Sequence, residues 1–191
     1  MISINDLAVP KSPFLDITTN RPSREWLMYL LALGRQPVYG SFIATTNQTV
    51  SAINTPFRLS LDTTTVANQI YFTPGDGIHV QQDGVYNVQF SAQVLNTDTA
   101  AHDADIWIRQ NGVDVPNTAS VFSVVGTHGG QPGFFVVAAN FYLTMTAGDY
   151  IEFWWSTNST QMSIQALPAI TTPFTSPASP GLVVTLQKVN L

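Results

Sequence analysis

The residues most suited to chemistry lie close together in one short segment, which contains Asp98, His102, Asp103 and Asp105. Calcium in proteins is held by about six to eight oxygen ligands, and three aspartates in one loop could supply some of them. We expect a solvated acidic loop, with a calcium site formed by Asp98, Asp103 and Asp105 as the alternative. No other metal and no cofactor is predicted.

A second pair of acids, Asp149 and Glu152, could suggest the two carboxylates of a glycosidase. Asp149 lies in a Gly-Asp turn and Glu152 in the strand predicted after it, so a cleft between them is not expected. The three histidines, His79, His102 and His128, fall in separate segments without the spacing of a metal site. The chain also lacks a phosphate-binding loop, a dinucleotide fingerprint and a Gly-x-Ser-x-Gly motif. We therefore predict no enzymatic activity.

The elements that would position these residues are β-strands. Residues 83–94 begin with an Asp-Gly turn and then alternate, which places Tyr86, Val88 and Phe90 on one apolar face. Asn-Gly and Gly-Asp turn signals separate further segments of this kind and favour an all-β sandwich or barrel. The pattern predicts strands at 41–46, 57–61, 78–81, 84–94, 104–110, 119–125, 134–145, 150–156, 162–166 and 182–189.

One helix is predicted before the strands, from about Pro22 to Leu33. Asn20 or Ser23 can cap its first turn, and Gly34 ends it. The apolar face of this helix consists of Trp26, Tyr29, Leu30 and Leu33, and it is widened by Leu27 and Leu31. A short helix of this composition needs a partner, which is either the chain's own β domain or another subunit or particle.

The charge composition limits the classes of partner. Only 10% of the residues are charged, and the formal net charge is −5. Residues 1–39 carry four basic and three acidic side chains, whereas residues 40–191 carry three basic and nine acidic ones. An acidic body argues against binding to nucleic acid, which requires neutralisation of phosphates. No apolar stretch reaches the ~18 residues of a membrane span, and no cysteine is present for a disulfide.

Three motifs in order along the chain carry a family resemblance. Gly84-Val85-Tyr86 opens a strand, Asn111-Gly112 closes a hairpin, and Gly148-Asp149 follows a long strand. Their order and spacing resemble the globular head of complement-type, tumour-necrosis-factor-like jelly rolls. The resemblance covers about residues 40–191. It implies an antiparallel jelly-roll β-sandwich of about ten strands, preceded by an extended arm and one short helix, that assembles as a homotrimer.

The N-terminal part resembles a different group of proteins. The run from Pro13 to Leu30, with Arg21-Pro22-Ser23 and Glu25-Trp26 at its centre, is similar to the leader of many small virion proteins of tailed bacteriophages. This chain has Asn20 where glycine is common, and asparagine tolerates the left-handed conformation. In such proteins the leader precedes a β-rich domain of this kind.

Together the two resemblances imply a virion appendage, a fibre, spike or knob, with two parts. Residues 1–38 would attach it to the head, neck or tail of the particle, and residues 39–191 would form the trimeric knob. The attachment residues would be Trp26, Tyr29, Leu30 and Leu33. The N-terminus shows no secretory signal, so we expect a protein made in the host cytoplasm and released by lysis.

Two other roles remain open at this point. The first is a dedicated receptor- or glycan-binding module that grips the host surface with the loops 96–104, 126–133 and 168–180. The second, weaker alternative is a minor capsid or decoration protein. A jelly-roll major coat protein is not favoured, because the chain is short and its knob is self-contained.

Two adjacent aromatic residues, Trp154 and Trp155, must point to opposite sides of one strand. One of them therefore leaves the core of its own subunit, and a large apolar group that faces outward usually marks an interface. We predict that this tryptophan contributes to the trimer interface, and both Trp154 and Trp155 are candidates for it.

Overall fold

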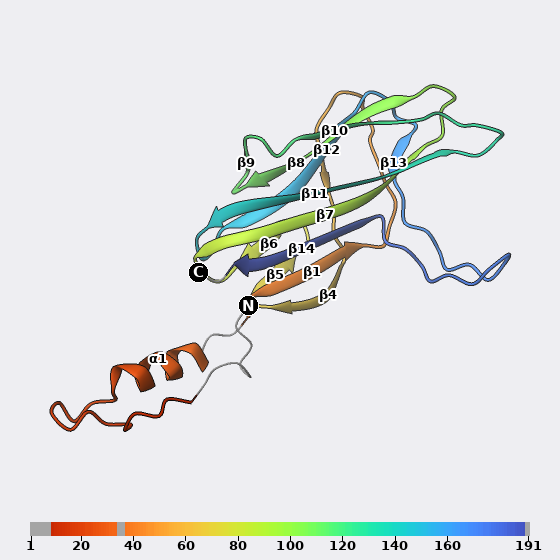
Figure 1. The fold of residues 1–191 in the computed structure, drawn as a ribbon. Helices are drawn as coiled ribbons and strands as arrows, with labels where there is room; N and C mark the ends of the chain where they lie inside the picture. The colour runs from red at the N-terminus through yellow and green to blue at the C-terminus, as the bar shows by residue number, and fades with distance from the viewer. Residues whose placement is uncertain (1–8, 34–36, 190–191) are drawn as a thin grey trace. The chain divides into compact units, whose positions relative to one another are not determined.

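Antiparallel strands make up most of the chain in the computed structural model, which describes residues 9–33 and 37–189 (Figure 1). Contacts divide the chain into two units, one that ends at Pro37 and one that runs from Val38 to Val189. Within the described residues, the first unit contains the helix and the second contains the strands.

The first sheet of the second unit contains seven strands: β1 (Tyr39–Ala44), β2 (Gln48–Thr49), β4 (Thr63–Asn68), β7 (Gly84–Asn96), β11 (Gly133–Met145), β13 (Met162–Ile164) and β14 (Leu182–Val189). β7 and β11 pair over their full lengths. On its other side β7 pairs with β14 and, at its end, with β13. The sheet continues from β14 through β1 to β4, and β2 pairs with β13. β11 therefore lies at an edge of this sheet.

The second sheet also contains seven strands: β3 (Phe57–Leu59), β5 (Ile70–Thr73), β6 (Gly77–Val80), β8 (His102–Gln110), β9 (Val113–Asp114), β10 (Ser120–Val124) and β12 (Tyr150–Thr157). β12 lies at its centre, with β8 on one side and both β6 and β3 on the other. β10 and β9 pair with β8, and β5 pairs with β6.

The two sheets share one apolar core. Along β7 the buried positions include Tyr86, Val88 and Phe90, as the alternation predicts. Phe90 contacts Phe153 of β12 edge-on, with ring centroids 5.4 Å apart, and this contact joins the two layers. The predicted fold class, mainly β with antiparallel sheets, is confirmed, and the arrangement is consistent with a β-sandwich. The jelly-roll connectivity stays a prediction.

The strands β4 and β5 are not predicted by the sequence pattern. All residues of β4 from Thr63 to Ala67 are exposed, so no apolar alternation identifies the strand. β4 forms because its backbone pairs with β1, which is a contact between segments and not a local signal. β5 has only four residues and forms a hairpin with β6. The two-residue strand β2 is not predicted either. All the predicted strands are present, with ends that differ by a few residues.

The first unit consists of an extended arm and the helix α1 (Arg24–Leu33). The backbone carbonyl of Ser23 accepts a hydrogen bond from the N–H of Leu27 at 2.9 Å, so Ser23 occupies the N-cap position. Asn20 has a φ of 54° and lies in the turn before the helix, where its tolerance of the left-handed region is used. The carboxylate of Asp16 closes this turn by accepting the N–H of Thr18 at 2.7 Å.

Candidate functional site

The acidic segment that could hold calcium is engaged in contacts of its own. Asp98 lies 2.7 Å from the Nε2 atom of His102, and Asp103 accepts a hydrogen bond from the hydroxyl of Ser123. Burial, and then the nearby charge of Asp103, raise the pKa of Asp105 in β8. Within residues 9–33 and 37–189, no three His, Cys, Asp or Glu side chains are grouped so that they could hold a metal ion.

The pair Asp149 and Glu152 is also held by structural hydrogen bonds. The side chain of Glu152 is only 9% exposed and lies 2.7 Å from a guanidinium nitrogen of Arg58. Asp149 accepts hydrogen bonds from the backbone N–H of Thr146 and the side chain of Asn111, both at 2.8 Å. Asp149 therefore connects the turn before β12 to the hairpin between β8 and β9. This role explains why an aspartate follows the glycine in that turn.

Asp149 gives a pH-dependent prediction. The N–H of Thr146 and the side chain of Asn111 lower the pKa of Asp149 below its ordinary value of about 3.9. A lowered pKa means that the carboxylate stabilises the fold above this value and loses that contribution as the pH falls. We expect Asp149→Asn to lower the free energy of unfolding at pH 7 by about 1 kcal/mol. In urea titrations the gap between variant and wild type should narrow at pH 3, and an unchanged gap would contradict the assignment.

The histidines lie in three different surroundings. His79 is stacked on Tyr71 with ring centroids 4.9 Å apart, and Tyr150 lies on its other side at 5.4 Å. His102 stands at the start of β8, and His128 is exposed in the loop before β11. His79 and His102 each face an aspartate, whereas the backbone of His128 forms an isolated bridge within its loop.

The prediction for the two tryptophans is wrong for Trp155. Trp155 is 1% exposed and belongs to the core between the sheets, so it is not available to another subunit. Trp154 faces the outer side of β12, where the guanidinium carbon of Arg109 lies 3.9 Å above its ring. Its indole N–H donates to Glu152 at 3.2 Å. The outward tryptophan is thus covered by its own chain, and its interface role stays a prediction.

The strand β11 presents an apolar surface at the edge of the first sheet. On its outer side Val136 is 58% exposed and Tyr142 is 66% exposed, and Phe134 lies on the same side. Phe135, on the other side, stacks on Phe122 with ring centroids 5.7 Å apart and is still exposed. Exposed apolar residues that lie together in this way are typical of a protein interface.

Sequence reasoning did not single out this surface, although a signal was present. Residues 134–139 form a continuous apolar run, whereas a strand with one solvated face alternates. Such a run is typical of a strand that is covered on both faces.

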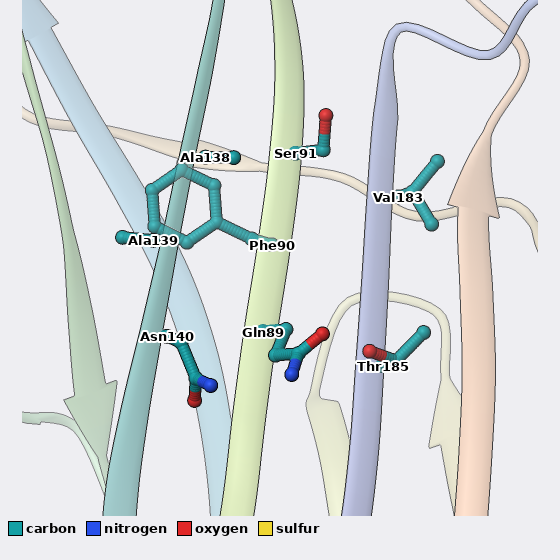
Figure 2. Close-up of a pocket in the computed structure, with 8 residues that line it drawn as sticks. All are labelled: Gln89, Phe90, Ser91, Ala138, Ala139, Asn140, Val183 and Thr185. Atoms are coloured by element: carbon teal, nitrogen blue, oxygen red, sulfur yellow. The ribbon is translucent and has the colours of Figure 1, made fainter.

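A hollow of about 490 Å³ lies beside this edge, on the outer face of the first sheet. Figure 2 shows its walls, which come from β11, β7 and β14. The lining residues are uncharged, namely Gln89, Phe90, Ser91, Ala138, Ala139, Asn140, Val183 and Thr185. The hollow forms because small side chains meet across the strands, where Ser91 pairs with both Ala138 and Val183. A second hollow of about 230 Å³ extends the depression towards β1 and is also lined by uncharged residues.

The helix uses its aromatic residues within its own unit. The ring of Trp26 contacts Phe14 and Tyr29 edge-on, with centroids 5.5 and 5.6 Å apart, and its indole N–H donates to the carbonyl of Ser12 at 2.8 Å. Trp26 is therefore engaged by the arm, and Tyr29 packs on Trp26 within the helix. Both side chains are half-buried, and their role in attachment stays a prediction. The indole needs a partner for its N–H, and the arm supplies it.

The exposed apolar side of α1 differs from the predicted attachment face. Its residues are 45–57% exposed, namely Leu27, Met28, Leu30 and Leu31. Leu30 thus keeps its predicted availability, while the side chain of Leu33 lies outside the described part of the chain. Among the described residues, no helix has the length and apolar character that crossing a membrane requires.

Three loops gather at one end of the second unit, remote from its chain ends (Figure 1). Tyr39 pairs with Gln187, which places the start of β1 and the end of β14 together. At the other end of the first sheet Asn96 pairs with Gly133 and with Met162. The loops that extend from this end comprise residues 97–101, 125–132 and 165–181, and they include most of the predicted receptor-contacting segments.

The longest of these loops is held by hydrogen bonds between its own backbone groups. Bridges join Leu167 to Ser179 and Ile170 to Ser176, so the Pro-rich segment forms an irregular hairpin. Phe174, near its tip, is 62% exposed. No residue between Glu152 and Lys188 is charged, so the tip offers an uncharged surface with one aromatic side chain.

No protein-family model matches the chain, and no curated protein matches it.

Proposed function

We propose that this chain is a structural protein of a bacteriophage virion, a trimeric fibre, spike or knob that its N-terminal unit holds on the head, neck or tail. In this role the second unit forms the knob, and three copies pack through the outer face of the first sheet. The N-terminal unit binds other virion proteins. No catalytic role is assigned to any residue.

The observation that carries the proposal is that, among the described residues, each unit exposes a group of apolar side chains. One is the exposed side of β11 with the uncharged hollow beside it, and the other is the open side of α1. Exposed apolar area of this extent is costly in a monomer and is typical of surfaces that other chains cover. The hollow fits side chains of a neighbouring copy, because its lining carries no charge that would be left unpaired. The resemblance of residues 13–30 to phage leaders supports a virion as the larger assembly.

A second candidate function is a receptor- or glycan-binding module at the remote loops. The observation in its favour is the ordered, uncharged loop that presents Phe174. A preordered loop loses little conformational entropy on binding, which favours recognition of another surface. The two functions are compatible, and loss of host adsorption after Phe174→Ala, with assembly retained, would separate them.

Removal of residues 1–35 tests the attachment role. Because the two units have separate internal contacts, we expect the truncated chain to keep its β circular dichroism spectrum and its trimeric mass. It should fail to sediment with virions, whereas the full chain should sediment with them.

A matched pair of point variants tests the open side of α1 directly. Leu27→Asp with Leu31→Asp should reduce sedimentation with virions at least tenfold. Met28→Leu keeps the surface apolar and should leave it unchanged. Sedimentation of the truncated chain at the level of the full chain would contradict attachment through this unit.

A further inference from the structure

His102 joins the loop 97–101 to the connection 158–161 through both nitrogens of its ring. Its Nε2 atom lies 2.7 Å from Oδ2 of Asp98, in the connection between β7 and β8. Its Nδ1 atom lies 3.1 Å from Oδ1 of Asn158, in the connection between β12 and β13. The side chain is largely covered, so these two contacts are the main polar environment of the ring.

The oxygen of Asn158 is an acceptor. The same Oδ1 atom receives the backbone N–H of Asp103 at 3.1 Å, and a backbone N–H can only donate. The orientation of the Asn158 amide is therefore determined by the backbone and not by the histidine. Nδ1 of His102 must then carry a hydrogen to bond with it.

The oxygen of Asp98 is an acceptor as well. Its other oxygen, Oδ1, accepts the N–H of Thr99 at 2.6 Å. The hydrogen bond from His102, and then that from Thr99, hold the pKa of Asp98 below its ordinary value, so the carboxylate is ionised at neutral pH. Nε2 of His102 must therefore carry a hydrogen too.

A neutral imidazole has one N–H and one acceptor nitrogen, so it can satisfy only one of these two oxygens. We propose that His102 is a doubly protonated latch that holds the connections 97–101 and 158–161 together, and that these loops loosen when the ring loses a proton as the pH rises. The latch is complete only while Asp98 is ionised and His102 is charged. The latch is therefore closed only between two pH limits. Below the lower limit Asp98 is protonated, and above the upper limit His102 has lost a proton.

Further hydrogen bonds connect a third loop to the two that His102 joins. The carbonyl of Asp98 accepts the N–H of Thr127 at 2.7 Å, which fixes the loop before β11. The side-chain amide of Asn96, next to this loop, donates to the carbonyl of Ala100 at 2.8 Å and to that of Val124 at 3.1 Å. The backbone N–H of Asn158 donates to the carbonyl of Asp103 at 3.2 Å. Three connections thus converge on His102 and Asp98.

The charged group that faces the ring is the carboxylate of Asp98, and two further carboxylates are near it in the sequence. Asp98 and Asp103 come from the loop and from β8, and Asp105 follows on the same strand. Val124 of β10, which pairs with His102, is uncharged, and Asn158 from the remaining connection is neutral. His128 in the loop before β11 is exposed. In the described part of the chain, no lysine or arginine forms an ion pair with Asp98 or Asp103, and His102 is the basic side chain that faces Asp98.

Histidine ring NMR of the ¹⁵N-labelled full chain tests the protonation state between pH 5 and pH 9. We expect both ring nitrogens of His102 to carry hydrogens wherever the loops are closed, and one of them to lose its hydrogen where the loops loosen. The exposed His128 serves as the internal control. A neutral His102 with a single tautomer at pH 6 would overturn the proposal.

Hydrogen exchange measures the opening of the loops over the same range. The protection factors of Thr99 and Thr127 should fall roughly tenfold or more as His102 deprotonates, which corresponds to the loss of one charge-assisted hydrogen bond. Protection of Asn111, in a hairpin at the other end, should not change. His102→Gln should give low protection of Thr127 at every pH, and His128→Gln should behave as wild type. Constant protection of Thr127 through the titration of His102 in the wild type would also overturn the proposal.

Discussion

Replacing Trp155 by alanine is expected to lower the free energy of unfolding by about 3–5 kcal/mol, which is a large part of the stability of a domain of this size. The ring is 1% exposed and lies between the two sheets, so truncation would leave a cavity in the core. The strand β12 lies at the centre of its sheet and pairs with β8, β3 and β6, which limits its ability to collapse into the space. Urea unfolding of the full chain at one fixed concentration measures the loss.

Trp154→Ala is the matched control, because it removes the same side chain from the adjacent position on the opposite face. This variant loses the contact with Arg109 and one hydrogen bond to Glu152, and we expect a cost of about 1 kcal/mol. Equal losses for the two variants would contradict the assignment of Trp155 to the core and Trp154 to the surface.

Replacing Val136 by aspartate is expected to convert the proposed trimer into a monomer. Val136 is exposed on the outer side of β11, next to the hollow, so in a trimer packed through this face the new carboxylate would be buried without a partner. In the monomer the same side chain is in water, so the fold is retained. Size-exclusion chromatography with light scattering should give three times the 20.8 kDa chain mass for the wild type and a single chain mass for the variant.

Val121→Asp is the control for charge and residue type. Val121 is exposed on β10, at the edge of the other sheet, and lies outside the proposed interface. This variant should remain trimeric. A wild-type chain that is monomeric at micromolar concentration would contradict the trimer itself, and a trimeric Val136→Asp variant would contradict this face as the interface.

Much of the sandwich is predictable from the sequence because its signals are local. The alternation in residues 84–94 identifies β7 and its buried face, and turn residues mark the ends of β8, β11 and β12. β4 is not predictable in this way, since its exposed threonines become a strand only through pairing with β1.

The two tryptophans illustrate a prediction that the sequence could have resolved. Ile151 and Phe153 point inward and Glu152 outward, so parity along the strand already places Trp155 inside and Trp154 outside. The contact of Arg109 with the ring of Trp154 cannot be predicted in this way, because Arg109 lies on β8, which is distant in the sequence.

The sequence by itself determined the all-β class, most strand positions and the division near residue 38, because alternation, turn residues and proline act over a few neighbouring positions. Only the tertiary structure decided which apolar groups stay uncovered. Trp26 is engaged because the arm brings Ser12 and Phe14 to it, which leaves the side of α1 with Leu27 and Leu31 open. The hollow beside β11 and the two acceptors around His102 likewise exist because strands and loops far apart in the chain meet, and no local pattern specifies such meetings.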